Sequence, residues 1–338
     1  DPGGYFIING SEKTVLAQER AAENQVYCFD TTKSSTKWDY TAEIKSIPDF
    51  KCISPKQITM MVASKNNGFG KPIYVQIPRL KSQTQIPLFV LFRALGVESD
   101  IDICRYILLD MEEYDADILN ALQASIVDAN KILTEEAALK AVTALVNYTP
   151  VNMDKERGAQ KKREFALEIL TNDLFPHCRN VAERRFFLGY MTHKLLACSL
   201  GIEQPDDRDS YLNKRIDTTG MLLNNLFRNY FNKVVKDMSK AVIKEINNGS
   251  WRGKGVYENI INHTNIYKIV KSTTIENGLR RALSTGDFSI KHSAGNKVGV
   301  AQVLNRLTYI SSISHLRRVN TPIDKNGKLV PPRKLHNT

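Results

Sequence analysis

Amide, hydroxyl and imidazole side chains stand among arginines near the C-terminal end of the chain. Gln302 and Arg306 come first, and His315, Arg317 and Arg318 follow after a run of serines. Amides and hydroxyls can bind ribose hydroxyls, while the guanidinium fork of arginine binds phosphate. The segment therefore holds the groups that nucleic-acid recognition needs.

Positive charge is concentrated in the same region. The chain carries 47 basic and 36 acidic residues, a net charge of +11, and residues 291–338 alone hold nine basic residues against Asp324, a net charge of +8. The basic residues of this region are Lys291, Lys297, Arg306, Arg317, Arg318, Lys325, Lys328, Arg333 and Lys334. Such a patch attracts polyanions, above all phosphate backbones. A solvated basic tail is the alternative, but apolar residues interleave with the charges and favour a packed segment.

A glycine-tipped loop is predicted at 323–330. The order Asp324-Lys325-Asn326-Gly327-Lys328 places a turn at Asn326-Gly327 and two lysines beside its tip. A loop of this kind can contact a nucleic-acid backbone without reading bases, although on sequence alone surface decoration is the simpler interpretation.

No local catalytic constellation is found elsewhere. Gly10-Ser11-Glu12-Lys13 lacks the glycines of a phosphate-binding loop, and we predict a hairpin turn there. The cluster Asp206-Asp207-Arg208-Asp209 could hold a divalent metal, but Pro205 and the arginine favour a solvent-facing loop with an internal ion pair. His177-Cys178 is interpreted as packing, and the spacing of histidines and cysteines predicts no zinc site.

The elements that position these residues change in type along the chain. The first ninety residues are predicted to be mainly β, with a hairpin at Asn9-Gly10, strands at 25–29, 58–63 and 73–77, and a turn at 66–68. From Ile101 helices dominate, with Thr134 as a predicted N-cap. A long helix is predicted at 215–246, a shorter one at 273–284, and a break at 285–287. The apolar stripe of the long helix is expected to be core: Leu223, Phe227, Tyr230, Val234, Met238 and Val242.

Composition places the chain among globular α+β proteins of more than one domain. Its 338 residues are 42% hydrophobic and 25% charged, which argues against global disorder, and its longest apolar run, 86–92, is too short to span a bilayer. Five widely spaced cysteines and no leader-like start suit a reducing, intracellular compartment. Because the chain begins at Asp1 rather than Met, we expect a piece of a longer protein.

Several stretches together resemble one known family. They are Gly4 to Lys13, Phe92 to Gly96, Phe187 to Met191, Asp206 to Asp209 with Lys214-Arg215, Gln302 to Arg318, Asn320 to Ile323 and Lys334 to Thr338. In this order they are similar to the second-largest subunit of multisubunit DNA-dependent RNA polymerases, with the RNA polymerase II type the nearest match. The resemblance runs from Gly4 to Thr338, and only Trp251 to Lys268 fits the family poorly.

The resemblance implies a modular fragment. Residues 1–50 would be the first part of the protrusion, 51–214 the lobe, 215–287 a return to the protrusion, and 288–338 the N-terminal part of the fork. The first fork loop would lie at Phe288 to Ser293 and the second at Ile323 to Val330. The family's later hybrid-binding, wall and clamp segments have no counterpart in this sequence.

The resemblance also implies a role in transcription. Gln302, Arg306, His315, Arg317 and Arg318 would lie in the wall of the cleft that holds the RNA–DNA hybrid, and the second fork loop would stand where downstream DNA opens. The parent complex is a nucleotidyltransferase that uses two magnesium ions, held mainly by the largest subunit, so this fragment is expected to bind no cofactor and to be inactive alone. Its expected partners are the largest and other polymerase subunits, template DNA and the hybrid, and no membrane.

The sequence also allows a different function. The chain could instead be a free-standing nucleic-acid-binding or scaffold protein that has kept a polymerase-subunit fold. Eukaryotes and large DNA viruses both suit as sources, so the expected location is the nucleus, or the virion and the host cytoplasm or nucleus.

Overall fold

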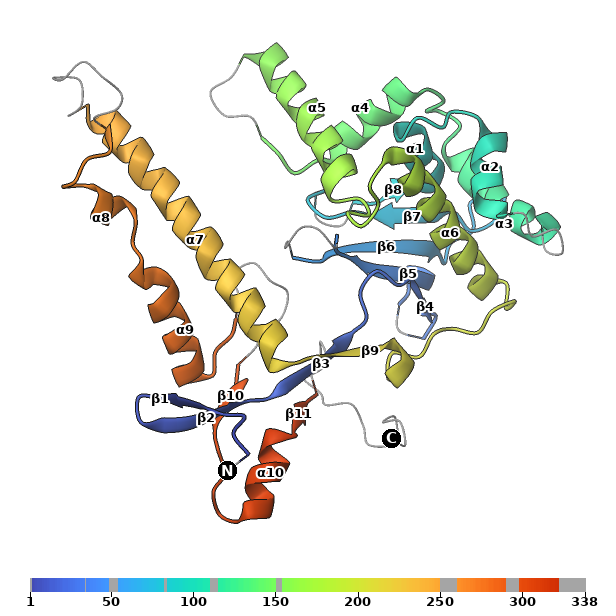
Figure 1. Cartoon of the computed structure of the whole chain (residues 1–338). Coiled ribbons are helices and arrows are strands. Elements are labelled where there is room, and N and C mark those ends of the chain that lie inside the picture. The colour runs from blue at the N-terminus through green and yellow to red at the C-terminus, as the bar shows by residue number, and fades with distance from the viewer. Residues whose placement is uncertain are drawn as a thin grey trace. The chain divides into compact units, whose positions relative to one another are not determined.

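A computed structural model describes residues 2–33, 35–48, 54–81, 84–109, 115–149, 154–249, 260–289 and 298–321 (Figure 1). The chain forms two compact units, one of residues 1–21 with 209–338 and the other of residues 22–208. Both units combine helices with small sheets, which confirms the α+β class. None of the helices in the described ranges is long and apolar enough to cross a membrane.

The unit 22–208 is built on an antiparallel sheet with the strand order β4-β5-β6-β7-β8. Its strands are β4 (Tyr27–Asp30), β5 (Trp38–Ser46), β6 (Lys56–Ala63), β7 (Ile73–Gln76) and β8 (Ile86–Pro87). The strands predicted at 25–29, 58–63 and 73–77 correspond to β4, β6 and β7 and are confirmed, while β5 was not predicted. Asn66 forms the predicted turn by accepting the backbone N–H groups of Gly68 and Gly70 at 2.7 and 3.0 Å.

Six helices follow these strands within the described part of this unit. They are α1 (Leu88–Ala94), α2 (Asp100–Leu108), α3 (Asp115–Asp128), α4 (Glu135–Leu145), α5 (Lys155–Asn172) and α6 (Val181–Ser199). Helix thus begins at Leu88, earlier than predicted, because the apolar run 86–92 forms a helix that is buried along its whole length. Thr134 caps α4 as predicted and accepts the backbone N–H of Ala137 at 3.3 Å.

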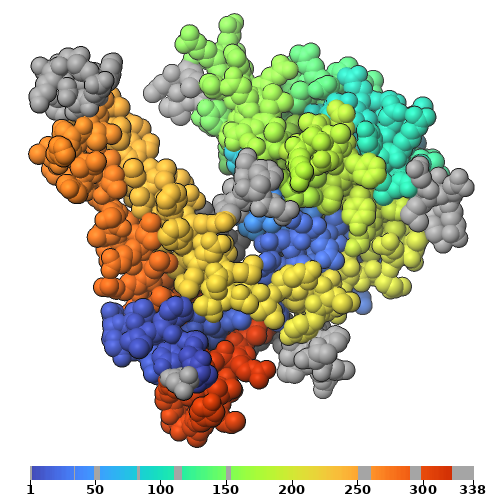
Figure 2. Space-filling view, in the orientation of Figure 1, coloured from blue at the N-terminus to red at the C-terminus, as the bar shows by residue number. Residues whose placement is uncertain are grey.

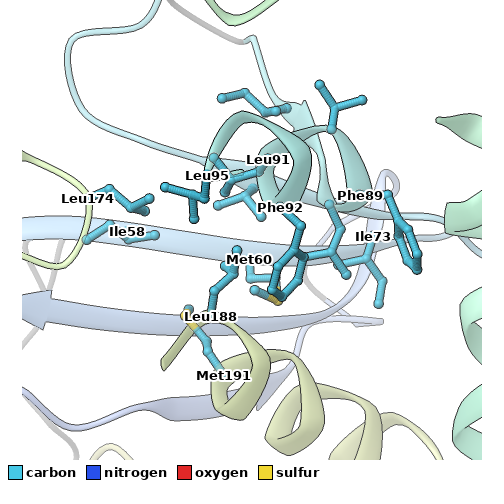
Figure 3. Close-up of a cluster of buried hydrophobic side chains, with 14 of the residues drawn as sticks. Ile58, Met60, Ile73, Phe89, Leu91, Phe92, Leu95, Leu174, Leu188 and Met191 are labelled. Atoms are coloured by element: carbon cyan, nitrogen blue, oxygen red, sulfur yellow. The ribbon is translucent and has the colours of Figure 1, made fainter. Parts of the chain in front are cut away.

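The core of this unit lies between the sheet and its helices. Figure 3 shows side chains of β6 and β7 packed against those of α1 and α6. The labelled residues include Ile58, Met60, Ile73, Phe89, Leu91, Phe92, Leu188 and Met191. Buried side chains from the strands and helices of residues 22–208 join into one continuous core.

The boundary expected at residue 50 falls inside this sheet. β5 and β6 pair over eight register positions, from Trp38↔Ala63 to Ser46↔Lys56. Strands that share a ladder and a core belong to one unit, so the unit begins at Ala22 rather than at residue 51. The assignment of the segments to protrusion, lobe and fork stays a prediction.

The loop at 206–209 is tied to the neighbouring strands. Asp206 accepts the backbone N–H of Cys28 at 2.8 Å and pairs with Lys194 at 3.0 Å. Arg208 lies 3.5 Å above the ring of Phe29 and reaches Glu43 at 3.3 Å. Pro205, Asp207 and Arg208 are exposed, as predicted for a solvent-facing loop, while these contacts tie Asp206 and Arg208 to the neighbouring elements.

The other unit joins both ends of the chain. β1 (Phe6–Ile8) and β2 (Ser11–Val15) form the predicted hairpin, with Asn9 and Gly10 at φ 49° and 78° as a type I′ turn requires. β10 (Ala301–Val303) adds to β2 on its other side. A second small sheet has the order β11-β3-β9, made of β3 (Ala17–Ala21), β9 (Lys214–Asp217) and β11 (Val319–Asn320).

Helices α7 (Thr219–Asn248), α8 (Ile266–Ile269), α9 (Thr273–Thr285) and α10 (Tyr309–Leu316) complete this unit. In Figure 1, α8 and α9 run back along one side of α7. The long helix was predicted to begin at Arg215, but 214–217 is strand β9 because it pairs with β3. The ion pairs Glu19–Lys214 at 3.3 Å and Arg20–Asp217 at 2.8 Å stabilise this pairing.

The predicted core stripe of α7 is confirmed only in part. Leu222 and Leu226 are the buried side chains of this helix, and Leu223 and Tyr230 are partly buried beside them. Phe227 is 44% exposed, and Val234, Met238 and Val242 are only partly buried. The partner helix α9 packs along this side of α7, with Tyr230 against Gly278, but the most deeply buried positions are Leu222 and Leu226, which the predicted stripe did not include.

Candidate nucleic-acid interface

The two ends of the described chain meet at the predicted site. β10 pairs with β2, and the backbone N–H of Leu304 continues this contact to the carbonyl of Glu12 at 2.9 Å. β11 runs parallel to β3, where Asn320 donates to the side chain of Gln18 at 2.9 Å. Figure 2 shows the red C-terminal residues packed against the blue N-terminal ones. Helix α10 is therefore held between two strands that are both anchored on the N-terminal segment.

Local sequence defines the start of α10. Thr308 and Ser311 form a reciprocal capping box, in which each side chain accepts the backbone N–H of the other residue at 3.0–3.1 Å. Ser312 donates to the carbonyl of Asn305 at 2.7 Å and ties the first turn to the preceding segment. The residues Thr308 to Ser312 thus fix the start of α10, and Arg317 and Arg318 follow directly after its last turn.

Arg306 is bound by the hairpin. Its Nε and Nη2 lie 2.8 and 3.0 Å from the two carboxylate oxygens of Glu12, and its guanidinium is 5.0 Å from the ring centre of Tyr5. The bidentate bond lowers the pKa of the Glu12 carboxyl and raises that of Arg306. Glu12 therefore offsets the charge that the sequence analysis assigned to phosphate binding.

His315 and Gln302 are bonded to each other. The His315 Nδ1 accepts the backbone N–H of Asn305 at 3.1 Å, and its Nε2 lies 3.1 Å from the Gln302 Oε1. The Gln302 Nε2 in turn donates to the carbonyl of Gly299 at 3.1 Å. Since His315 is only 5% exposed and both ring nitrogens are engaged, it acts here as a buried link between α10 and β10.

Arg317 and Arg318 are exposed directly after α10. They stand between the buried His315 and the strand β11, so both flanks of the pair are fixed to the rest of the unit. The other predicted contacts, Lys291, Lys297, Lys325, Lys328, Arg333 and Lys334, lie outside the described residues. So do most of the first predicted fork loop and all of the second.

Exposed apolar side chains at the start of α10 were not predicted as part of the site. Leu307, Tyr309 and Ile310 are 87, 72 and 75% exposed, an unusual density for adjacent positions. An aromatic ring in this position offers a face on which a base or another ring can stack. The signal available in the sequence was the run Leu-Thr-Tyr-Ile among polar residues, which had been interpreted as packing.

Side chains that could ligate a metal or act as nucleophiles also occur among the described residues. Within the described ranges no group of three or more His, Cys, Asp or Glu residues could hold a metal ion. Cys28, Cys104, Cys178 and Cys198, the cysteines of the described residues, are buried, and burial raises the pKa of Cys28 to about 12 and that of Cys178 to about 11. Thiols with such pKa values stay protonated near neutral pH and are poor nucleophiles.

Comparison with known proteins agrees with this geometry. Residues 22–217 match the family model described as RNA polymerase Rpb2, domain 2, which covers more than half of the chain. The chain belongs to the RNA polymerase Rpb2 family. Residues 302–338, which include α10 and the arginine pair, match the model for Rpb2 domain 3. The first of these matches nearly coincides with the compact unit 22–208.

Relatives within the Rpb2 family align along the whole chain. The DNA-directed RNA polymerase II subunit RPB2 of Schizosaccharomyces pombe is 39% identical over 345 residues, and subunit 2 of Arabidopsis thaliana RNA polymerase II is 36% identical over 346. DNA-directed RNA polymerase subunit 2 of Acanthamoeba polyphaga mimivirus is 34% identical over 362 residues. These alignments cover 100% of this chain but 26–28% of each relative, so the chain spans about a quarter of their length.

Proposed function

We propose that this chain is part of the second-largest subunit of a DNA-directed RNA polymerase. The observation that carries the proposal is alignment of all 338 residues with RNA polymerase II subunits, together with two Rpb2 family models matched in chain order. The chain would contribute one wall of the cleft for the RNA–DNA hybrid and the loops that keep the DNA strands apart.

Binding in this role is electrostatic. Arg317 and Arg318, with the basic residues in the rest of 291–338, would offset the repulsion between phosphates of the hybrid. Because guanidinium and ammonium groups hold backbones without reading bases, the wall would accept any transcribed sequence. The loop 323–330 would separate strands mainly by excluding volume at the point where the duplex opens.

Catalysis would take place on another subunit. Nucleotidyl transfer by two magnesium ions needs carboxylates that place the ions about 4 Å apart. In the proposed complex the largest subunit holds these ions, and this chain positions the nucleic acid. Such a protein would act inside the cell: in the nucleus of a eukaryote, or in the virion or host cell of a virus.

Copurification tests the proposal directly. A tagged subunit that contains these residues should copurify in stoichiometric amount with a largest polymerase subunit, and the purified complex should synthesise RNA on a DNA template. The 338-residue chain alone should incorporate no labelled nucleotide. Purification as a free protein that binds nucleic acid would instead favour a free-standing binding or scaffold protein, and RNA synthesis by the isolated chain would contradict the assignment of catalysis.

A further inference from the structure

The buried histidine of α10 has a defined protonation state. An imidazole nitrogen accepts a hydrogen bond only through a lone pair, and the Nδ1 of His315 faces the backbone N–H of Asn305 at 3.1 Å. The proton of the neutral ring must therefore be on Nε2, which then donates to the Gln302 Oε1 at 3.1 Å. The orientation of the Gln302 amide agrees with this, since its Nε2 donates to Gly299.

The hydrogen bonds of His315 matter for the site because this residue lies close to the arginine pair in the chain. It lies in the last turn of α10, one residue before Leu316, and Arg317 and Arg318 follow at once. On the far side of the arginines, β11 is fixed to β3 and Asn320 to Gln18. Of the two anchors that flank the arginine pair, the imidazole link on the α10 side is the one that can gain a proton near neutral pH.

We propose that His315 is a positioning residue whose neutral imidazole, bonded to Asn305 and Gln302, fixes the direction in which Arg317 and Arg318 meet nucleic acid. The inference rests on the proposed function and refines it. Protonation places a second N–H against the backbone N–H of Asn305, so the bond to Nδ1 is lost and the end of α10 is released from β10. The histidine thus acts through the arginines and not as a phosphate contact of its own.

The surrounding charges favour the neutral ring. Burial lowers the pKa of His315 below its ordinary value of 6.5, and the charge of Arg318 lowers it further. On the facing strand β2, Glu12 is bound by Arg306 and Lys13 is positive, while β10 and β11 carry no titratable side chain. The neutral ring therefore contributes its full stabilisation to the folded state above pH 6.5, the ordinary pKa of histidine. This contribution is lost as the pH falls through the lower pKa that His315 has in the folded protein.

A positioning role and a direct phosphate contact predict opposite effects of acid on the binding of nucleic acid. If His315 bound phosphate as a cation, acid would strengthen binding of nucleic acid, because protonation adds a positive charge. If it positions the arginines as a neutral ring, binding should weaken as it is protonated. The direction of the pH dependence therefore separates the two roles.

Nitrogen NMR of the histidine-labelled 338-residue chain tests the link itself. The His315 signal, assigned by its disappearance in His315→Gln, should report a neutral ring protonated on Nε2 at pH 7 and a pKa below 6.5. Gln302→Glu should raise this pKa, because a carboxylate stabilises the charged ring. A ring protonated on Nδ1, or a charged ring at pH 7, would overturn the proposal whatever the polymerase does.

Binding of an RNA–DNA hybrid by the assembled polymerase tests the consequence. His315→Phe should weaken binding about three- to tenfold at pH 7.5, as expected for loss of one or two hydrogen bonds, and His315→Gln should restore most of it. Between pH 7.5 and 5.5 the unsubstituted enzyme should lose affinity relative to His315→Gln, and Gln302→Glu should shift this loss to higher pH.

The outcomes distinguish the positioning role from the proposed function. If charge reversal of Arg317 and Arg318 weakens binding but His315→Phe does not, the positioning role is wrong and the interface stands. If neither change matters, the interface itself is wrong. Stronger binding at low pH that disappears in His315→Gln would assign His315 to direct phosphate contact and contradict the proposal.

Discussion

Gly189 explains one of the motifs that identify this family. It lies in α6 where that helix crosses α2, and a Cβ atom at this position would stand 2.0 Å from the backbone carbonyl oxygen of Tyr106. Backbone atoms cannot move aside as the end of a flexible side chain can. The sequence Phe-Leu-Gly-Tyr-Met therefore needs glycine for close approach of two helices, and not for an unusual backbone angle.

We expect Gly189→Ala to lower the free energy of unfolding of the unit 22–208 by about 2 kcal/mol or more, since the helices must separate to admit the methyl group. Gly220→Ala is the control, because that helical glycine has no atom within 4 Å of the added Cβ. The control should be neutral or should stabilise by up to about 1 kcal/mol. Urea denaturation followed by circular dichroism measures both, and equal effects would contradict the close approach.

The arginine pair gives a second prediction at the scale of residues. Arg317→Glu with Arg318→Glu should weaken binding of nucleic acid by the polymerase more than Lys161→Glu with Lys162→Glu. The lysine pair is an apt control because it lies on exposed α5, where Lys161 already pairs with Glu164 at 2.9 Å. Each lost phosphate contact should also reduce the slope of log affinity against log salt by about 0.9.

Affinity titrations from low to moderate salt measure both effects. Equal loss of affinity from the arginine and lysine pairs would show that the excess charge of 291–338 does not define the interface. An unchanged salt slope in the arginine variant would show that the two guanidinium groups do not contact phosphate.

Interpretation of the site from sequence succeeded for residues whose surroundings are local, and failed for residues whose partners are distant in the chain. Arg317 and Arg318 were assigned to the site from the local run of basic residues, and both are exposed directly after α10, a helix that was not predicted. The partner of Arg306 is Glu12, 294 residues earlier, and no local pattern reveals it. His315 was grouped with the arginines by neighbourhood in sequence, while its two bonds bury it and turn it away from a ligand.

At the scale of elements, the hairpin, the N-cap of α4 and the end of α7 could be predicted, and the start of α7 could not. Asn9-Gly10 and Thr134 act within a few residues of their effect, so their signals are local. The helical pattern extends back over 215–217, but pairing with β3 makes these residues a strand. Tertiary contact overrides local propensity where a partner strand offers a complete ladder.

The packing face of α7 gives an element-scale prediction. Leu226 is 2% exposed within the small core that α7 shares with α9 and β2, whereas Phe231 is 50% exposed. Leu226→Ala should therefore cost about 2–4 kcal/mol of stability, and Phe231→Ala about 1 kcal/mol or less. Chemical denaturation of the 338-residue chain measures both. A larger loss from Phe231→Ala would show that the exposed side of α7 contributes more to stability than its contact with α9.

At the scale of the whole molecule, the unit 22–208 is inserted into the other. The chain leaves along β3 and returns along β9, and these strands pair antiparallel from Gln18↔Asp217 to Ala21↔Lys214. The ends of the insertion are therefore adjacent, as domain insertion requires. The family resemblance implied a return of the chain at residue 215, but no local pattern shows it, because strands nearly two hundred residues apart carry it.

Closing the ladder directly tests this organisation. We expect a chain in which an Asn-Gly turn replaces residues 22–213 to fold into the remaining unit, because Ala21 and Lys214 already lie opposite each other and a two-residue turn can join them. In an antiparallel ladder, hydrogen-bonded pairs alternate with non-hydrogen-bonded pairs, and the two kinds of pair need different turns. A second version therefore carries a four-residue glycine-rich turn.

Residues 22–208 expressed alone should fold as well, because their sheet and core are complete without the rest. Cooperative unfolding of each chain, at denaturant midpoints that match two transitions of the 338-residue protein, would confirm two independent units. If both closed chains fail to fold while 22–208 folds, the N- and C-terminal segments depend on the insertion for their structure.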